Sequence, residues 1–359
     1  MISNLWINLP QDDFVGLFGQ CTNSSFANIV VENANIIALG TVDTLVGNLS
    51  TNSTIDNCHV SNVTVTGTDF NCGGLVGGIL TDSSISKSSS KGDVTGQSQV
   101  GGIVGTAWDF TTITECYSEG TVNGEYLIGG LVGYCTYAFV PNRTNTIVNS
   151  YSRATVTANL GRAGGVYGGA DGACEISNTY STGAVTGPEF VGGFMGAFGG
   201  GSVIISNSFY DLDTSGKDEA VGGFTAGEAS YEIEGRNTAD MKIEELVNLL
   251  NSGADEDVWS MDPSVNDGYP VLDNLLAVDA VQAETHSLTV YPSVFESQIN
   301  VSTHLNLQSY SLYNTSGKLV SKGSLRNTSS IQTAAIASGL YILKINTQNG
   351  AVTKKVIKK

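Results

Sequence analysis

The chain has 359 residues and a formal net charge of −18, and only 14% of its residues are charged. Residues 1–282 hold 8 Lys/Arg against 32 Asp/Glu, whereas residues 283–359 hold 8 against 2, which indicates two physically different parts. Such an acidic body excludes nucleic acid as a partner, because binding to phosphates requires clustered Lys and Arg. No run of 18 apolar residues occurs, so we expect no membrane-spanning segment.

A Gly-Gly pair recurs through the first two thirds of the chain. Its first residue falls at Gly73, Gly101, Gly129, Gly164, Gly192 and Gly222, with spacings of 28, 28, 35, 28 and 30 residues. Val15 and Asp43 hold the same phase in two earlier, degenerate copies. A period of about 28 residues without a helical pattern predicts an all-β fold, a parallel β-helix solenoid of about eight coils over residues 1–225. The long interval holds an insertion between Tyr134 and Thr146, which we expect to form one loop.

Equivalent positions of the coils should stack in columns about 4.8 Å apart. The aromatic position of the repeat reads His59, Ser89, Tyr117, Tyr151, Tyr180 and Phe209. We expect a packing ladder there, with an exposed ligand-binding row at Tyr117, Tyr151 and Tyr180 as the alternative. Another position reads Asn57, Asn149, Asn178 and Asn207, and we expect these residues at a turn.

The six cysteines do not show the spacing of a metal site, since no C-x-x-C pair occurs. Cys58 and Cys116 share one phase and lie two coils apart, which is beyond the reach of a disulfide. Cys21 and Cys135 share another phase, four coils apart. We therefore expect small buried cysteines rather than disulfides.

Candidate catalytic groups are sparse in the repeats. Asp69, Glu125 and Glu189 precede their Gly-Gly pairs, but they are two or more coils apart, with Gln97 near the missing place. Glycoside hydrolysis needs two carboxyl groups about 5–9.5 Å apart, so we expect solvated turns here. His59 follows Cys58 directly, so the two side chains point to opposite faces of a strand and form no catalytic dyad.

One acidic turn follows the last tyrosine of the ladder. FYDLDTSGKDE, residues 209–219, places Asp211 and Asp213 as in the start of a calcium-binding loop. The bidentate Glu that should follow is replaced by Gly222, so we expect no cofactor and a tight exit turn, with calcium at Asp211 and Asp213 as the alternative.

A different pattern follows the repeats. Ile243, Leu246, Val247 and Leu250 form the apolar stripe of one amphipathic helix over residues 239–251. We expect residues 226–272 to cap the open end of the solenoid, and residues 273–287 to form a linker.

The repeated phrases V-G-G-L-V-G and N-S-Y-S-x-G-x-V-T-G resemble the GLUG motif family. The resemblance covers about residues 1–225. Members of that family are mostly large exported bacterial proteins, including adhesins and surface metallopeptidases in which the repeats are accessory. The resemblance implies a surface shaft or binding module rather than a catalytic domain.

The last 72 residues alternate apolar and polar positions between glycine turns, which predicts a small immunoglobulin-like β-sandwich over residues 288–359. This segment resembles the type A C-terminal sorting domain of the bacterial type IX secretion system. Leu288–Val294 matches the opening strand of that domain, with Ser293 and Val294 in place of Asn and Pro. The matching motif residues are Tyr291, Pro292, Gly317, Gly339, Tyr341, Lys354 and Lys355. The resemblance implies the type IX secretion machinery as a partner, and a secreted or outer-membrane surface-attached location.

Export of this kind begins with a signal peptide, and the pattern of residues 1–19 is that of a coil instead. We therefore expect Met1 to lie within a longer protein.

These patterns together predict a non-catalytic, adhesin-like structural or binding protein, with a host glycan or protein as a further partner. Two alternatives stay open at this point. The repeats could be the accessory region of a larger surface protease, or the β-helix could be an enzyme that acts on polysaccharide.

Overall fold

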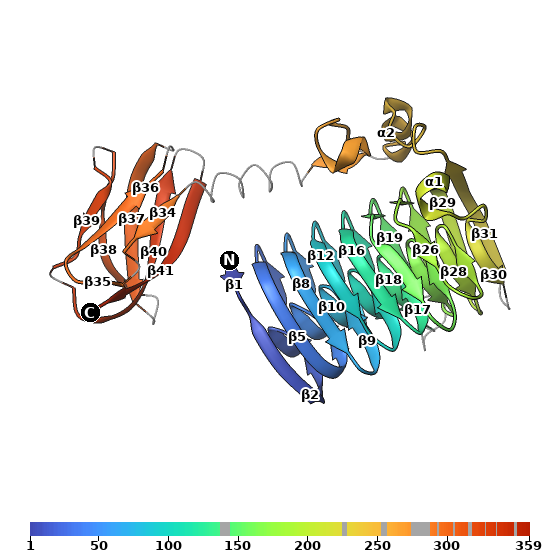
Figure 1. Ribbon diagram of the computed structural model, residues 1–359, viewed down its shortest axis with the longest axis horizontal. Coiled ribbons are helices and arrows are strands. Elements are labelled where there is room, and N and C mark those ends of the chain that lie inside the picture. Colours follow the sequence, from blue (N-terminus) through green and yellow to red (C-terminus); the bar gives the residue numbers. More distant parts are fainter. Residues whose placement is uncertain are drawn as a thin grey trace. The chain divides into compact units, whose positions relative to one another are not determined.

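The structure is a computed structural model that describes residues 1–136, 144–224, 228–252, 257–273, 288–292, 294–303, 306–314, 318–326, 328–334, 336–347 and 350–359. Two compact units divide the chain, Met1–Asp273 and Asn274–Lys359. The first unit is a parallel β-helix of about eight turns, as the 28-residue period predicts (Figure 1).

Two parallel sheets form the walls of the solenoid. One sheet contains eight strands, one from each coil. In chain order they are β3 (Phe18–Thr22), β6 (Val46–Ser50), β10 (Val76–Leu80), β14 (Val104–Trp108), β18 (Val132–Cys135), β23 (Tyr167–Ala170), β28 (Met195–Phe198) and β30 (Val221–Phe224).

The second sheet winds around the rest of each coil and contains 23 strands. In the first four coils they are β1 (Ile2–Ser3), β2 (Trp6–Val15), β4 (Ser25–Ala27), β5 (Val30–Val42), β7 (Thr54–Asp56), β8 (His59–Gly67), β9 (Phe70–Gly73), β11 (Ser84–Ser86), β12 (Ser89–Thr95) and β13 (Ser98–Gly101). In the later coils they are β15 (Thr112–Thr114), β16 (Tyr117–Gly124), β17 (Tyr126–Gly129), β19 (Asn145–Val148), β20 (Tyr151–Ser152), β21 (Thr155–Ala158), β22 (Ala163–Gly164), β24 (Cys174–Ser177), β25 (Tyr180–Ser181), β26 (Val185–Thr186), β27 (Val191–Gly192), β29 (Ser202–Asp211) and β31 (Glu228–Arg236).

Equivalent residues stack in register, as the repeat predicts. The apolar column pairs from coil to coil and is buried throughout; it consists of Ile55, Ile85, Ile113, Ile147, Ile176 and Ile205. The register also survives the insertion, because Ile113 pairs with Ile147 across it. Residues 137–143 of that insertion lie outside the described residues.

The Gly-Gly column marks the corner where the chain passes between the two sheets. Gly73, Gly101 and Gly129 pair with one another in adjacent coils. A Cβ atom on Gly73 would overlap the carbonyl oxygen of Val76, and one on Gly101 would overlap that of Val104. In these later coils the corner therefore requires glycine, because the backbone turns back on itself too closely for any side chain, whereas the second coil has Asp43 there.

The asparagine column lies at a turn, as predicted. Asn57, Asn149, Asn178 and Asn207 all have φ between 43° and 50°. Asparagine tolerates this left-handed conformation better than most residues. Side-chain amides of this column also form hydrogen bonds from coil to coil, with Asn207 Nδ2 2.7 Å from Asn178 Oδ1.

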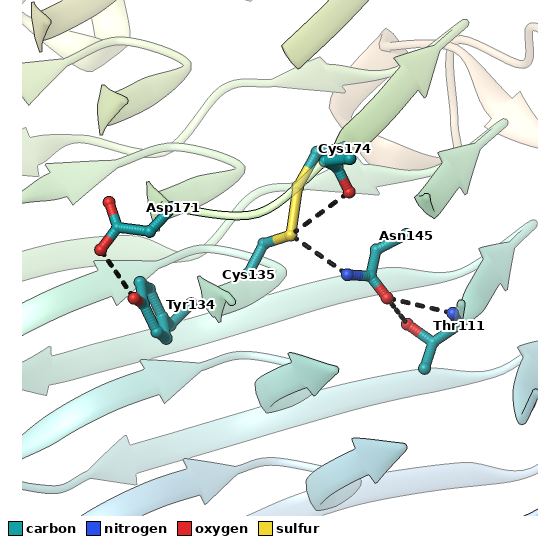
Figure 2. Close-up of a disulfide and its surroundings, with 7 residues drawn as sticks. Thr111, Tyr134, Cys135, Asn145, Asp171 and Cys174 are labelled. Atoms are coloured by element: carbon teal, nitrogen blue, oxygen red, sulfur yellow. Dashed lines mark hydrogen bonds between the residues drawn. A yellow bond between two sulfur atoms is a disulfide. The ribbon is translucent and has the colours of Figure 1, made fainter. Parts of the chain in front are cut away.

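The prediction that the cysteines form no disulfide is wrong. Cys135 and Cys174 are joined, while Cys21, Cys58, Cys72 and Cys116 are free. Figure 2 shows this disulfide, with the Asn145 amide 3.3 Å from the sulfur of Cys135 and 3.0 Å from the backbone N–H of Thr111.

The prediction failed because it compared cysteines of the same phase. Cys135 ends β18 in one sheet, whereas Cys174 begins β24 in the other, so the disulfide joins two different columns near the insertion.

The residues after the last coil contain a short helix, as predicted, although it is shorter than expected. The elements here are α2 (Glu244–Leu250), β32 (Trp259–Ser260), η1 (Asn266–Gly268) and β33 (Val271–Leu272), whereas the one-turn helix α1 (Leu212–Ser215) lies earlier, between β29 and β30. The segment packs on the flank of the preceding coils: Trp259 contacts the ring of Tyr151, and Asn207 donates to the carbonyl oxygen of Leu249.

The predicted cap over the open end is therefore corrected to a lateral cover. Phe224 and Tyr231 of the last coil remain 58% and 51% exposed. Leu246, Val247 and Leu250 of α2 are buried, and the contacts to the tyrosine column come from Trp259 and Tyr269.

The second unit contains two sheets that are consistent with the predicted β-sandwich. The three-stranded sheet holds β34 (Thr289–Tyr291), β36 (Gln298–Ser302) and β39 (Ser330–Gln332). The five-stranded sheet holds β35 (Val294–Phe295), β37 (Leu307–Asn314), β38 (Leu319–Ser324), β40 (Gly339–Thr347) and β41 (Gly350–Lys358). Phe295, Ile299, Leu312, Leu343 and Val356 form part of the core between them. Residues 274–287, most of the predicted linker, lie outside the described residues.

Candidate functional site

The predicted aromatic ladder is present in the solenoid. Tyr117 and Tyr151 stack with ring centroids 4.9 Å apart and an interplanar angle of 12°. Tyr151 and Tyr180 stack at 5.0 Å and 3°. His59 occupies the same column, as expected, with Nδ1 2.9 Å from the hydroxyl oxygen of Ser89.

The alternative that this row is an exposed ligand-binding surface is wrong. Tyr117, Tyr151 and Tyr180 are 4%, 2% and 0% exposed. Trp259 and Tyr269 of the lateral cover lie against the rings of Tyr151 and Tyr180. Burial raises the pKa of both Tyr151 and Tyr180 well above the ordinary value for tyrosine. A ligand cannot reach these rings, so the row is a packing ladder.

The proposed calcium carboxylates bind protein groups instead. Asp211 is fully buried and caps α1, accepting a hydrogen bond from the backbone N–H of Thr214 at 3.0 Å. Its other oxygen accepts from the hydroxyls of Thr238 and Tyr269, both at 2.8 Å. Asp213 accepts from the backbone N–H of Thr238 at 2.8 Å.

Both carboxylates thus accept hydrogen bonds from protein groups. In the described part of the chain, no three His, Cys, Asp or Glu side chains lie together as a metal site would require. Asp211 thus caps α1, and Asp211 and Asp213 both bond to Thr238 of the cover; calcium at these two carboxylates stays a prediction.

The candidate carboxylate pair is divided by an intervening coil. The backbone N–H of Gln97 bonds to the carbonyl oxygen of Asp69, and that of Glu125 bonds to the carbonyl oxygen of Gln97. Asp69 and Glu125 thus belong to one column with Gln97 between them. This order does not bring two carboxyl groups into adjacent coils, as a glycosidase pair would prefer.

A groove that the sequence did not reveal lies over the first coils. It has a volume of about 200 Å³ and is lined by residues of β6, β10 and β14 of the eight-stranded sheet and of β2, β5 and β9 of the other sheet. Its eight lining residues are Phe14, Thr41, Asn48, Asn71, Gly78, Leu80, Thr106 and Trp108. We call it the Trp108 groove.

The walls of the Trp108 groove come from two columns of the solenoid. Phe14, Thr41 and Asn71 occupy one corner column, and all three have left-handed backbone, with φ of 59°, 44° and 61°. Opposite them, Leu80 and Trp108 pair in register at the ends of β10 and β14. Phe14 and Trp108 are 39% and 36% exposed, so part of each aromatic surface is open to solvent.

The floor of the groove carries a connected polar network. The Thr106 hydroxyl lies 2.6 Å from Asn71 Oδ1 and 3.0 Å from Gln99 Oε1. Asn71 Nδ2 lies 3.5 Å from the Thr41 hydroxyl. These bonds hold the amide of Asn71 in place and leave it further hydrogen-bonding capacity, because a primary amide has two donors and two acceptor sites.

The chemistry of this set is non-covalent. The eight lining residues include no Asp, Glu, His, Cys, Lys or Arg, so they supply neither an acid–base pair nor a charged anchor. Aromatic surface beside amide and hydroxyl groups is the usual composition of a binding pocket. The groove can therefore bind and orient a neutral molecule.

A repeat-to-repeat comparison could have found the groove. One outward-facing position of the eight-stranded sheet pairs from strand to strand. In successive coils it is occupied by Asn48, Gly78, Thr106, Tyr134 and Gly169. The position just before it is glycine in each of these coils, so the variable position was a signal that side chains there do not serve the fold.

In the second unit, sorting-motif residues lie on strands β40 and β41 of the five-stranded sheet. Tyr341 is buried on β40, and its hydroxyl donates to the carbonyl oxygen of Ala337 at 2.8 Å. Lys354 and Lys355 on β41 pair with Leu343 and Ile342 of β40.

Other motif residues lie at the edges of these strands. Tyr291 ends β34 and is half-exposed, Pro292 follows it, and Gly339 begins β40. Gly317 and Ser293 lie outside the described residues.

Two known families match the chain. The GLUG motif matches residues 96–123, which span one coil of the solenoid, and the secretion system C-terminal sorting domain matches residues 289–359, the second unit. A search of curated proteins gave no match. Within the part of the chain that the structure describes, the helices are too short and too polar to cross a membrane. The chain is thus a GLUG-motif β-helix with a type IX C-terminal sorting domain, which makes it a secreted or outer-membrane surface-attached protein.

Proposed function

We propose that this protein is a non-catalytic, adhesin-like binding protein that the type IX secretion system delivers to the cell surface. The Trp108 groove is the observation that carries the proposal. It exposes aromatic surface and amide groups on a rigid sheet, and its lining residues hold no titratable side chain that could act as a general acid or base.

The rest of the solenoid supports a binding role over a catalytic one. The aromatic ladder is buried, and the column of Asp69 and Glu125 is interrupted by Gln97. Side chains held on a continuous β-sheet are also well positioned for recognition, since the scaffold loses little conformational freedom on binding.

Adherence of particles coated with the protein tests this proposal. The full chain, coupled to beads, should attach to host cells or to other bacteria above the level of beads coated with an unrelated acidic protein. Deletion of the gene should lower adherence of the producing bacterium. If coated beads and the deletion strain both behave as their controls do, the adhesin function is rejected. Turnover of a polyuronide or neutral polysaccharide by the pure protein would favour the enzyme alternative instead.

A further inference from the structure

We propose that the Trp108 groove is a subsite for a neutral pyranose unit of a glycan. The inference deepens the proposed function and rests on it, because it names the ligand class of a protein taken to be a surface binder. Three features of the groove carry it: its aromatic walls, its charge-free polar floor, and a glycine in the floor that the fold does not require.

The walls match the shape of a sugar ring. A pyranose has an apolar face of C–H groups and a rim of hydroxyl groups, so it stacks on an aromatic side chain while its rim forms hydrogen bonds. Phe14 and Trp108 supply partly exposed aromatic surface, and Leu80 lies in register beside Trp108. A pocket lined by aromatic side chains with a few placed polar groups fits such an amphipathic ligand.

The polar floor of the groove disfavours charged ligands. Asn48, Asn71 and Thr106 can donate to and accept from hydroxyl groups, and the bond between Thr106 and Asn71 fixes their orientation before a ligand arrives. The lining residues offer no cation to a carboxylate or sulfate group, and the surrounding protein carries 32 acidic against 8 basic residues over residues 1–282. Anionic sugars are therefore disfavoured.

Gly78 gives the groove its depth. It lies between Asn48 and Thr106 in the outward-facing column of the sheet. A Cβ atom on Gly78 would approach only side-chain atoms, with Asn48 Oδ1 at 3.3 Å and Leu80 Cδ1 at 3.6 Å. At Gly77, by contrast, a Cβ would lie 2.7 Å from the carbonyl oxygen of Gly47. The fold thus requires glycine at position 77 but not at 78, and the absence of a side chain at 78 leaves open space for a ligand.

A peptide is a poorer occupant of the same groove. Extended peptides bind most readily by adding a strand to an exposed sheet edge. Strand β10 already pairs with β6 and β14, and β14 pairs with β10 and β18, so both strands at the groove are internal. A peptide therefore finds no free strand edge for main-chain pairing at the groove, whereas a sugar can bind through side-chain groups alone.

The test measures binding of the full chain to a neutral β-glucan, a mannan and a galactan, with polygalacturonate as the anionic comparison. Gly78→Val fills the floor, and Trp108→Ala removes one wall. Trp6→Ala is the matched control, because Trp6 is 67% exposed and does not line the groove. We expect at least one neutral polymer to bind, with affinity lowered about 10-fold or more in both groove variants and unchanged in Trp6→Ala.

Circular dichroism and thermal unfolding of each variant show that the solenoid stays folded. Binding that is equal in Gly78→Val, Trp108→Ala and the wild type overturns the groove assignment. Preference for polygalacturonate, or binding to a protein and to no neutral polymer, overturns the ligand class. Bead adherence of the same variants separates the two proposals. If Gly78→Val adheres as the wild type does, the adhesin function is kept and the subsite assignment is rejected. If the wild type does not adhere, the adhesin function itself is rejected.

Discussion

Asp43 is a buried acid at a position where later coils have glycine, and replacing it by asparagine should stabilise the protein. Its side chain is fully buried in the corner of the second coil. Oδ2 accepts from the backbone N–H of Gly77 at 3.1 Å, but Oδ1 has no hydrogen-bond partner. Burial raises the pKa of Asp43 well above its ordinary value, and the backbone N–H groups of Gly77, Val46 and Leu45 oppose the shift only in part.

The direction of the pH dependence follows from that shift. Because the folded-state pKa of Asp43 lies above the unfolded value of about 3.9, the contribution of Asp43 to the free energy of unfolding is most favourable below pH 3.9. Stability is then lost as the pH rises from the unfolded pKa through the folded pKa. Since protonating an ordinary carboxyl group at pH 7 costs about 4 kcal/mol, the loss from this one residue cannot exceed about 4 kcal/mol at that pH.

An unsatisfied buried oxygen by itself costs about 1–3 kcal/mol. Asp43→Asn keeps an acceptor for the Gly77 N–H and removes the charge. We therefore expect Asp43→Asn to exceed the wild type in stability by about 1–4 kcal/mol at pH 7, with the difference shrinking toward pH 4.

Denaturant unfolding from pH 4 to pH 8, followed by circular dichroism, measures this difference. Asp12→Asn is the control, because it removes the same charge from an exposed position in the first coil. A stability difference that does not change with pH, or an Asp43→Asn protein less stable than the wild type at pH 7, would refute the reasoning.

Four further outcomes follow from the structure. Tyr151→Ala should lower the free energy of unfolding by about 3–5 kcal/mol and Tyr151→Phe by less than about 1, because only the former opens a cavity between stacked rings; denaturant titration measures both, and equal losses would contradict the ladder. Thiol titration of the unfolded, unreduced protein should count four free cysteines and the reduced protein six, with Cys135 and Cys174 as the difference. Calcium should leave the melting temperature unchanged, whereas Asp211→Ala should lower stability by about 2 kcal/mol; a calcium-dependent rise in melting temperature would instead support calcium binding at Asp211 and Asp213. Removing residues 288–359 should keep the protein inside the producing cell, as immunoblots of cell fractions and medium would show, and unchanged export would contradict the assigned role of the sorting domain.

Periodicity made the solenoid predictable. A residue that recurs in every coil, such as Ile113 or Gly101, meets its own equivalent above and below, so its environment follows from the repeat alone. The same reasoning placed His59 in the tyrosine column and Gln97 between two acidic residues. In each case the partner lies one period away along the chain.

Contacts between different columns could not be predicted in this way. The disulfide joins Cys135 to Cys174 across two phases, near an insertion that breaks the spacing. Trp259 covers Tyr180 from 79 residues further along the chain, in a segment that has no repeat. Burial of the tyrosine row therefore depended on a partner whose position no spacing rule supplies.

The same distinction explains where a solenoid can carry a specific site. A position with the same residue in every coil presents a uniform stripe, which cannot mark one place along the axis. Specific recognition needs positions at which the residue type changes from coil to coil. The Trp108 groove has such positions: Gly78 lies between Asn48 and Thr106, and Leu80 pairs with Trp108. Positions that repeat hold the coils together, as the buried tyrosines do, whereas outward positions that vary are free to serve a ligand. A side chain at position 78, as in Gly78→Val, should therefore remove binding while the stacked coils persist.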